Sequence, residues 1–192
     1  MNARVGVVVV HFGSPQPTRR CVASVLGDPS PVERLLVVVD NSGNLPELAN
    51  AVLLRCPDNP GFGEGANRGI RLLADRGVPA VVVLNHDVEI MPGFFSSVVR
   101  HVQREGVGAV GGPLFFPDGR RLWAAGGAVL WPLGTVRQFR SLRRAWRARP
   151  VGFLPGAALG LRWDAFWQVG GFDPRFFVYH EDLDLCLRLR RA

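Results

Sequence analysis

The chain has 192 residues, of which 47% are hydrophobic and 20% are charged, so its composition is that of a globular protein and its length suits one domain with a sizeable core. No stretch approaches the ~20 apolar residues of a membrane-spanning helix, and three cysteines, an odd number, do not fit a disulfide framework and indicate a reduced, cytosolic protein. The net charge is +7, all basic residues are arginine, and this charge suits an anionic partner such as a nucleotide sugar, a lipid head group or a nucleic acid.

The first half of the chain alternates predicted strands and helices. Short runs rich in β-branched residues predict buried strands, with a helix after the first of them. The predicted strands are 5–10, 35–39, 52–55 and 80–84, and the predicted helix is 18–26. This order is typical of a βαβ unit, and such sheets bind ligands beyond the carboxyl ends of their strands. His11 and the Asp40-Asn41 pair stand at those ends and are candidate ligand-binding residues.

A glycine-rich loop at 59–67 leads into a predicted helix that ends near residues 76–77. Glycines allow the backbone to approach a phosphate or a ribose closely, so this loop could contact a ligand. The loop lacks the Gly-Lys-Ser/Thr of a nucleotide-binding P-loop. On its own it is more often an ordinary loop than a ligand site.

The predicted strand 80–84 ends in a polar sequence, Asn85-His86-Asp87. A carboxylate at the end of a buried strand can coordinate a divalent cation, and hard oxygen ligands suit Mg²⁺ or Mn²⁺. The alternative is that Asp87 only forms a turn. For His86, the two alternatives are a further metal ligand and a side chain that faces the solvent.

The middle of the chain predicts a helix at 92–104, a strand at 107–111 and a hairpin at 113–123, which 128–131 extends. Residues 133–150 contain six arginines, and apolar residues recur among them at three- and four-residue spacing. This pattern predicts a helix over 136–147 that lies on an anionic membrane surface. A solvated basic loop is an equally good interpretation.

Three carboxylates, Glu181, Asp182 and Asp184, open a predicted helix that ends in arginines at 188, 190 and 191. Acids at the start and bases at the end match the helix dipole. Carboxylates beside aromatic residues at a helix N-terminus are candidates for a general base. From spacing alone, helix capping with surface ion pairs is the simpler interpretation.

The run from Gly170 to Arg188 resembles the closing motif of family 2 glycosyltransferases, particularly bacterial rhamnosyltransferase-like members. The 59–67 loop and the Asn85-His86-Asp87 sequence match that family in the same order. The resemblance implies an α/β domain of the GT-A fold, with a Rossmann-like, mostly parallel central sheet flanked by helices. It implies one domain over 1–192, with a nucleotide-binding part at about 1–90 and an acceptor and catalytic part at about 91–192.

The resemblance also implies an activity and roles for individual residues. The family transfers a sugar from a nucleotide diphosphate donor to an acceptor hydroxyl with inversion; dTDP-rhamnose or a UDP-sugar is the expected donor, and a cell-envelope or lipid-linked glycan the acceptor. Asp182 would be the general base and Asp87 the ligand of Mg²⁺ or Mn²⁺, with His86, Glu181 and Asp184 as secondary candidates. The implied donor-binding residues are His11, Asp40, Asn41, Gly61, Gly63, Asn67, Asn85, Gly156 and Ala157.

The sequence departs from the family pattern at two places. Asn85 replaces an acid and His86 a proline, and family members continue well beyond the acidic helix, which predicts an acceptor part that is incomplete at the C-terminus. The alternatives are therefore a shortened nucleotide-sugar-binding remnant without turnover, or a basic membrane-binding module. No nucleic-acid motif is present, so no nucleic acid is expected as a partner. The expected location is cytoplasmic, with peripheral attachment to the inner face of the cell membrane as a further option.

Overall fold

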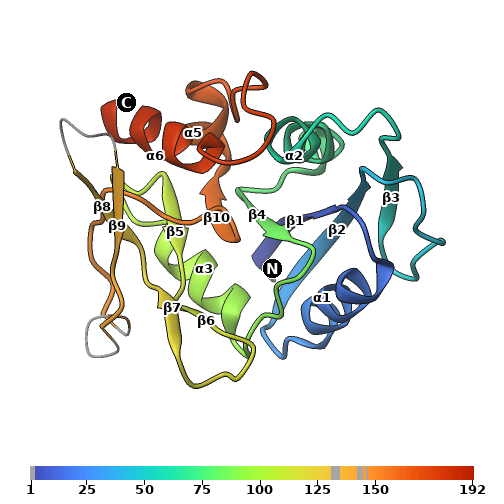
Figure 1. Cartoon of the computed structure of the whole chain (residues 1–192), viewed down its shortest axis with the longest axis horizontal. Coiled ribbons are helices and arrows are strands. Elements are labelled where there is room, and N and C mark those ends of the chain that lie inside the picture. Colours follow the sequence, from blue (N-terminus) through green and yellow to red (C-terminus); the bar gives the residue numbers. More distant parts are fainter. Residues whose placement is uncertain (1–2, 131–134, 142–144, 146) are drawn as a thin grey trace.

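The computed structural model describes residues 3–130, 135–141, 145 and 147–192. A six-stranded sheet in the order β3-β2-β1-β4-β10-β5 crosses the molecule, with helices on both faces (Figure 1). Four neighbouring strands are parallel, and β10 is antiparallel to both β4 and β5, which confirms the predicted α/β domain with a mostly parallel sheet. The strands of this sheet are β1 Ala3–His11, β2 Val32–Asp40, β3 Val52–Arg55, β4 Ala80–Asn85, β5 Ala109–Gly111 and β10 Ala158–Arg162.

The valine-rich runs form the centre of the sheet because both of their faces are covered. All residues from Val5 to His11 are buried, as are those from Leu36 to Asp40 and from Ala80 to Leu84. Such continuous burial removes both faces of each strand from water, and β-branched side chains pack well on a pleated surface. The strands predicted at 5–10, 35–39, 52–55 and 80–84 are confirmed, and two of them extend further towards the N-terminus.

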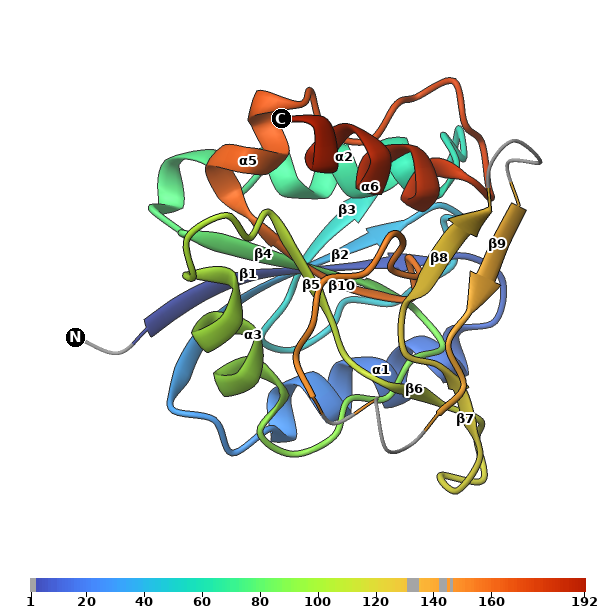
Figure 2. The same ribbon diagram turned by 90° about the vertical axis from the view of Figure 1, so that its left-hand side faces the viewer.

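The helices form two layers, one on each face of the sheet (Figure 2). α1 and α3 pack on one face, where Val25 and Phe95 belong to one buried cluster, while Ile70, Phe166 and Leu185 belong to the cluster on the other face. The helices are α1 Pro15–Gly27, α2 Phe62–Arg71, the 3-10 turn η1 Ala74–Arg76, α3 Phe94–Val102, α5 Trp163–Gln168 and α6 Glu181–Arg191. The predicted helices at 18–26, 92–104 and 181–191 are confirmed within a few residues at each end.

Two small antiparallel ribbons lie beside the sheet. β6 Leu114–Phe115 pairs with β7 Leu122–Ala124, which confirms the predicted hairpin, and β8 Gly127–Leu130 pairs with β9 Thr135–Gln138. The β8–β9 ribbon brings the middle of the chain close to the N-terminus of α6 (Figure 2).

The prediction of a helix over 136–147 is wrong at its start, because residues 135–138 form β9. Val136 pairs with Val129, and burial alternates along β9 with a period of two, as in a half-covered strand. The predicted apolar face also used Leu142 and Trp146, which lie outside the described residues with Arg143 and Arg144. The membrane-surface interpretation therefore loses the helical face on which it depended. Among the helices that the structure describes, none is long and apolar enough to cross a membrane.

Candidate active site

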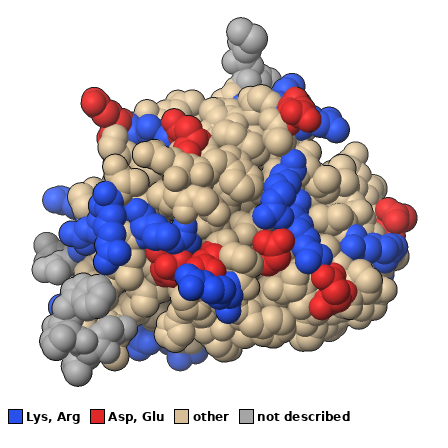
Figure 3. Space-filling view, turned by 90° about the horizontal axis from the view of Figure 1, so that it is seen from above, with Lys and Arg blue, Asp and Glu red and all other residues tan. Residues whose placement is uncertain are grey.

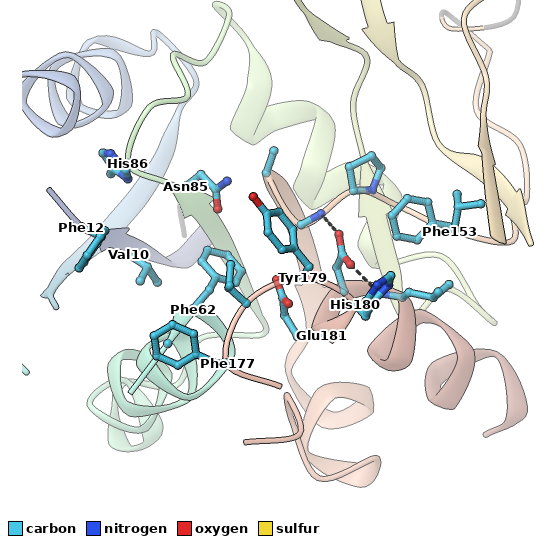
Figure 4. Close-up of a pocket in the computed structure, with 18 of the residues that line it drawn as sticks. Val10, Phe12, Phe62, Asn85, His86, Phe153, Phe177, Tyr179, His180 and Glu181 are labelled. Atoms are coloured by element: carbon cyan, nitrogen blue, oxygen red, sulfur yellow. Dashed lines mark hydrogen bonds between the residues drawn. The ribbon is translucent and has the colours of Figure 1, made fainter. Parts of the chain in front are cut away.

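The carboxyl ends of β1, β2 and β4 meet at one edge of the sheet. His11 stands beside Asp40, and Val10 beside Asn85, in the strand register. A cavity of about 1020 Å³ opens at this edge, between the sheet, the start of α2 and the start of α6 (Figure 4). The predicted site residues that line it are Asn41, Gly61, Asn85, His86, Gly156, Ala157, Glu181 and Asp182.

Asp182 lines this cavity from the first turn of α6. Its Oδ2 accepts a hydrogen bond from the Gly156 N–H at 2.7 Å, and its Oδ1 accepts one from the Leu183 N–H at 2.8 Å. Burial raises the pKa of the Asp182 carboxyl, although the two N–H groups favour its charged form. The structure thus presents a fixed carboxylate that binds a proton more readily than an ordinary aspartate.

Gly156 and Ala157 tie this carboxylate to the sheet. A side chain at Gly156 would begin 3.1 Å from the Asp182 Cβ, so the close approach of the two segments favours glycine. The next residue, Ala157, accepts a hydrogen bond through its carbonyl from the Asn85 N–H at 3.0 Å. Asn85, which ends β4, is therefore connected through the 156–157 segment to Asp182.

Glu181 lines the same cavity but lacks a full set of partners. Its side chain is buried, with 6% of the residue exposed, and its Oε2 has no hydrogen-bond partner among the described residues. Burial, and the nearby Asp182 carboxylate, raise the pKa of Glu181. The preceding residues Tyr179 and His180 both adopt left-handed backbone conformations, with φ of 69° and 71°. Such conformations are costly away from glycine, and they cluster at functional sites.

Asp184 lies apart from the cavity. Its Oδ2 pairs with Arg188 at 2.6 Å, one turn further along α6, and Arg188 also donates to the Val169 carbonyl. This arrangement holds α6 against the segment after α5. Of the three carboxylates, Glu181 and Asp182 therefore face the cavity, and Asp184 is engaged in the packing of the helix.

The turn before α2 forms the opposite wall. Gly61 has a φ of 85°, and a Cβ there would overlap the Phe177 carbonyl, which accepts the Phe62 N–H at 3.0 Å. Asn41 donates through Nδ2 to the Gly61 carbonyl, while its Oδ1 is buried and has no partner among the described residues. Gly63 does not line the cavity; it packs against Phe172, whose Cβ lies 3.1 Å from the point where a side chain at Gly63 would begin.

His11 and Asp40 lie beneath the site with fully buried side chains. The two Asp40 oxygens accept the backbone N–H groups of Ser42, Gly43 and Leu45, at 2.8 to 3.0 Å. The imidazole of His11 bonds to Thr18 and Asn44. Neither side chain lines the cavity; both hold the loop that presents Asn41.

Asn67 connects α2 to the C-terminal quarter of the chain. Its Nδ2 donates to the Phe172 carbonyl at 2.8 Å, and its Oδ1 accepts the Phe172 N–H at 3.0 Å. The residue is buried and outside the cavity lining. The Asn67 side chain therefore supplies hydrogen bonds to the backbone N–H and carbonyl of Phe172, which lies outside the strands and helices.

His86 and Asp87 directly follow β4; His86 lies on the side of the cavity away from His180 (Figure 4), and Asp87 does not line the cavity. Asp87 is exposed and forms no ion pair among the described residues, while His86 lines the cavity, where burial lowers its pKa. The described residues contain no cluster of three or more His, Cys, Asp or Glu side chains that could hold a metal. One free carboxylate beside a neutral imidazole fits a cation that takes most of its ligands from a diphosphate and from water.

Aromatic and basic residues complete the cavity wall, and they were not among the predicted site residues. Phe12 and Tyr179 are 58% and 76% exposed at its mouth, and Arg137 reaches it from β9. The aromatic run at 176–179, before the acidic helix, could have pointed to Tyr179. The sequence near Arg137 does not show that the β8–β9 ribbon approaches the cavity. Exposed aromatic rings at a cavity mouth suit the stacking of a base or a sugar.

Comparisons with known proteins agree with this arrangement. The glycosyl transferase family 2 model matches residues 6–170. N-acetylglucosaminyl-diphospho-decaprenol L-rhamnosyltransferase of Mycobacterium tuberculosis (strain ATCC 25618 / H37Rv) is 35% identical, over 97% of this chain and 70% of the relative's length.

Solved structures share the fold at low identity. A mannosyltransferase from Pyrobaculum calidifontis in complex with GDP-Man and Mn²⁺ is 14% identical, with a TM-score of 0.62 over 96% of this chain. TarS 1-349 of S. aureus is 13% identical, with a TM-score of 0.67 over 97%. The chain spans about half the length of these two proteins, 51% and 55%. With the family match over most of its residues, the chain belongs to glycosyl transferase family 2 and is a GT-A glycosyltransferase of the rhamnosyltransferase-like kind.

Proposed function

We propose that this protein transfers a sugar, with inversion, from a nucleotide diphosphate donor to a hydroxyl of a lipid-linked or cell-envelope glycan. The observation that carries the proposal is Asp182, a carboxylate with raised pKa that two backbone N–H groups fix in the wall of a large cavity. The L-rhamnosyltransferase activity of the 35% identical relative favours an L-rhamnosyl donor, with dTDP-rhamnose as the first choice and UDP-sugars next. The same relative favours a lipid-diphosphate-linked acceptor. Peripheral attachment to the inner face of the cell membrane is part of the proposal and would give the protein access to such an acceptor.

Asp182 is the proposed general base. The acceptor oxygen attacks the anomeric carbon while its proton passes to the Asp182 carboxylate, and the bond from that carbon to the diphosphate oxygen breaks with its electron pair on the diphosphate. One displacement of this kind inverts the configuration. The Gly156 and Leu183 N–H groups keep the carboxylate in place, which lowers the entropic cost of reaching the reactive geometry.

The donor occupies the side of the cavity formed by the ends of β1, β2 and β4. Asn41 and Gly61 border its nucleotide, and Asn85, Gly156 and Ala157 border its sugar. His11, Asp40, Gly63 and Asn67 act on the donor through the loops they hold. A divalent cation, Mg²⁺ or Mn²⁺, would be held by Asp87 with His86 and would neutralise charge on the leaving diphosphate.

A pair of matched substitutions tests the base. Asp182→Asn keeps the size and one acceptor oxygen of the side chain but removes the proton acceptor, so turnover with donor and acceptor should fall by ~10²-fold or more. Donor affinity, measured by calorimetry, should stay near the wild-type value. Asp184→Asn, the same change two residues later on α6, should cost much less because Asp184 faces Arg188.

Two results would contradict the proposal. Comparable turnover in the Asp182→Asn protein, or a larger loss in the Asp184→Asn protein, would place the base elsewhere. Donor binding without turnover in the wild-type chain, with acceptors of both the lipid-linked and free glycan type, would favour the nucleotide-sugar-binding protein without transferase activity.

A further inference from the structure

We propose that a second groove, at the free edge of β5, binds the phosphate-bearing end of an isoprenoid-linked acceptor. The groove has a volume of about 560 Å³ and lies between α3, β5, residues 147–154 and α6. In Figure 2 this side faces the viewer, with α3 below β5 and α6 above it. The occupant is named on the basis of the proposed function, whereas the anion site itself follows from the residues below.

The groove is lined by several basic side chains. Among the described residues that line it there is no aspartate or glutamate. Its cationic residues are Arg104, Arg147, Arg149 and Arg190, with His101 beside them. None of these four arginines has a recorded ion pair with a described residue. Because like charges gathered without counter-charges repel one another, the groove favours an anion.

The face that carries α2 and α6 shows the opposite arrangement. There, basic and acidic side chains lie side by side (Figure 3), and the recorded pairs include Arg68 with Asp58 and Arg188 with Asp184. The arginine-rich composition therefore does not explain why the groove arginines have no ion pair with a described residue. The difference between the two surfaces marks the groove as a place for a ligand that brings its own negative charge.

Arg149 gives the sharpest indication. Its guanidinium lies 4.4 Å from the centroid of the Phe139 ring, and its Nη2 is buried without any hydrogen-bond acceptor among the described residues. A buried guanidinium N–H without an acceptor is costly. The planar guanidinium also matches phosphate oxygens with two parallel hydrogen bonds. A phosphate at this position would supply the missing acceptor.

The groove floor is apolar, so the groove suits an amphiphilic ligand better than a simple anion. Its apolar side chains come from α3, β5, α6 and the 147–154 segment, and they include Phe94, Val98, Val110, Leu154 and Leu189. An isoprenoid chain would cover this surface, and its burial contributes roughly 25 cal/mol per Å² of apolar area. Inorganic phosphate would use the arginines and leave the floor in water.

The position of the groove fits the proposed acceptor. Phe153 lines both the groove and the main cavity, so the two spaces share a wall. Asp182 and Arg190 both belong to α6; Asp182 lines the cavity and Arg190 lines the groove. The eight-residue step from one to the other corresponds to about 12 Å along the helix axis. A sugar ring followed by a diphosphate is of comparable length. An acceptor with its hydroxyl at Asp182 would therefore bring its diphosphate to the arginines.

Calorimetry with farnesyl diphosphate tests this inference on the intact 192-residue chain. Saturating UDP with Mn²⁺ is present throughout to occupy the main cavity, and farnesol and inorganic pyrophosphate serve as the two partial probes. We expect farnesyl diphosphate to bind more tightly than either partial probe, and less tightly at high salt. Arg149→Gln should weaken its binding by about tenfold or more, the scale of one charge-assisted hydrogen bond.

Two further variants serve as a second test and as a control. Arg190→Gln, at an exposed residue of the groove, should weaken binding in the same direction even if Arg149→Gln disturbs folding, and Arg19→Gln, at an exposed arginine of α1, should not. Equal binding of farnesol, equal binding of pyrophosphate, or equal losses in all three variants would each overturn the inference. Binding of farnesyl diphosphate that appears only when UDP is omitted would do so too, because it would place the ligand in the main cavity. These measurements need no turnover, so loss of the proposed transferase activity alone leaves them intact.

Discussion

Replacing Asn67 with alanine should destabilise the fold rather than remove a donor contact. The Asn67 amide holds both backbone groups of Phe172, with bonds of 2.8 and 3.0 Å in a buried setting. Alanine leaves two buried backbone groups unpaired, each at a cost of ~1–3 kcal/mol, and we expect a net loss of about 3 kcal/mol as water enters the space. For a chain of this length each kcal/mol lowers Tm by about 2–4 °C, so the expected shift is about 6–12 °C.

Calorimetric unfolding and nucleotide titration together decide the role of Asn67. Gln103→Ala removes a carboxamide from an exposed residue at the end of α3 and should leave Tm within about 2 °C of wild type. At a temperature where both variants are folded, UDP affinity in Mn²⁺ should be within about threefold of wild type for each, since Asn67 does not line the cavity. A small change in Tm combined with a large loss of UDP affinity would refute this reasoning and make Asn67 a direct ligand.

Two further predictions concern the metal and the pH dependence. Asp87→Ala should weaken UDP binding in Mn²⁺ by about tenfold or more without lowering Tm. Asp75→Ala, at another exposed aspartate, should change neither the UDP affinity nor Tm. Unchanged UDP affinity in the Asp87→Ala protein would remove Asp87 from the metal site. Because burial raises the pKa of Asp182 and only its ionised form accepts a proton, kcat/KM should fall as pH decreases through a pKa above that of ordinary aspartate. The Glu181→Gln protein should show the same fall of kcat/KM at low pH. If the fall disappears in that variant, it belongs to Glu181, whose pKa is also raised.

The predicted fold was accurate where local sequence leaves a single interpretation. Runs such as Val5 to Val10 are too short for a helix and too apolar for a loop, so they identify central strands directly. The segment at 136–147 has no such constraint, because Val136 satisfies both a helical spacing and a two-residue alternation. Its pairing with Val129 decides the outcome, and that contact depends on how the ribbon folds back.

The predicted site contains a similar division. Asp182 and Gly61 line the cavity, and the sequence singled them out because their neighbours belong to the same motifs. Asp40 and Asn67 were predicted as ligand residues, yet the hydrogen bonds recorded for them are within the protein. A polar side chain beside glycines can serve a ligand or an unpaired backbone group equally well. Only the three-dimensional position of that backbone group distinguishes the two, and for Asn67 it is supplied by Phe172, 105 residues away.

The place of β10 in the sheet has a consequence for biosynthesis. β10 Ala158–Arg162 lies between β4 and β5, although both of those strands precede it in the chain. During translation, β1 to β4 can pair as they emerge, but β5 has no place in the sheet until β10 arrives. The edge of β4 stays open meanwhile, and open edges of apolar strands invite association with other chains. A ribosome that pauses before residue 158 would therefore expose an aggregation-prone half-sheet, and synthesis of the next thirty or so residues would close that edge and deliver Asp182 beside Gly156.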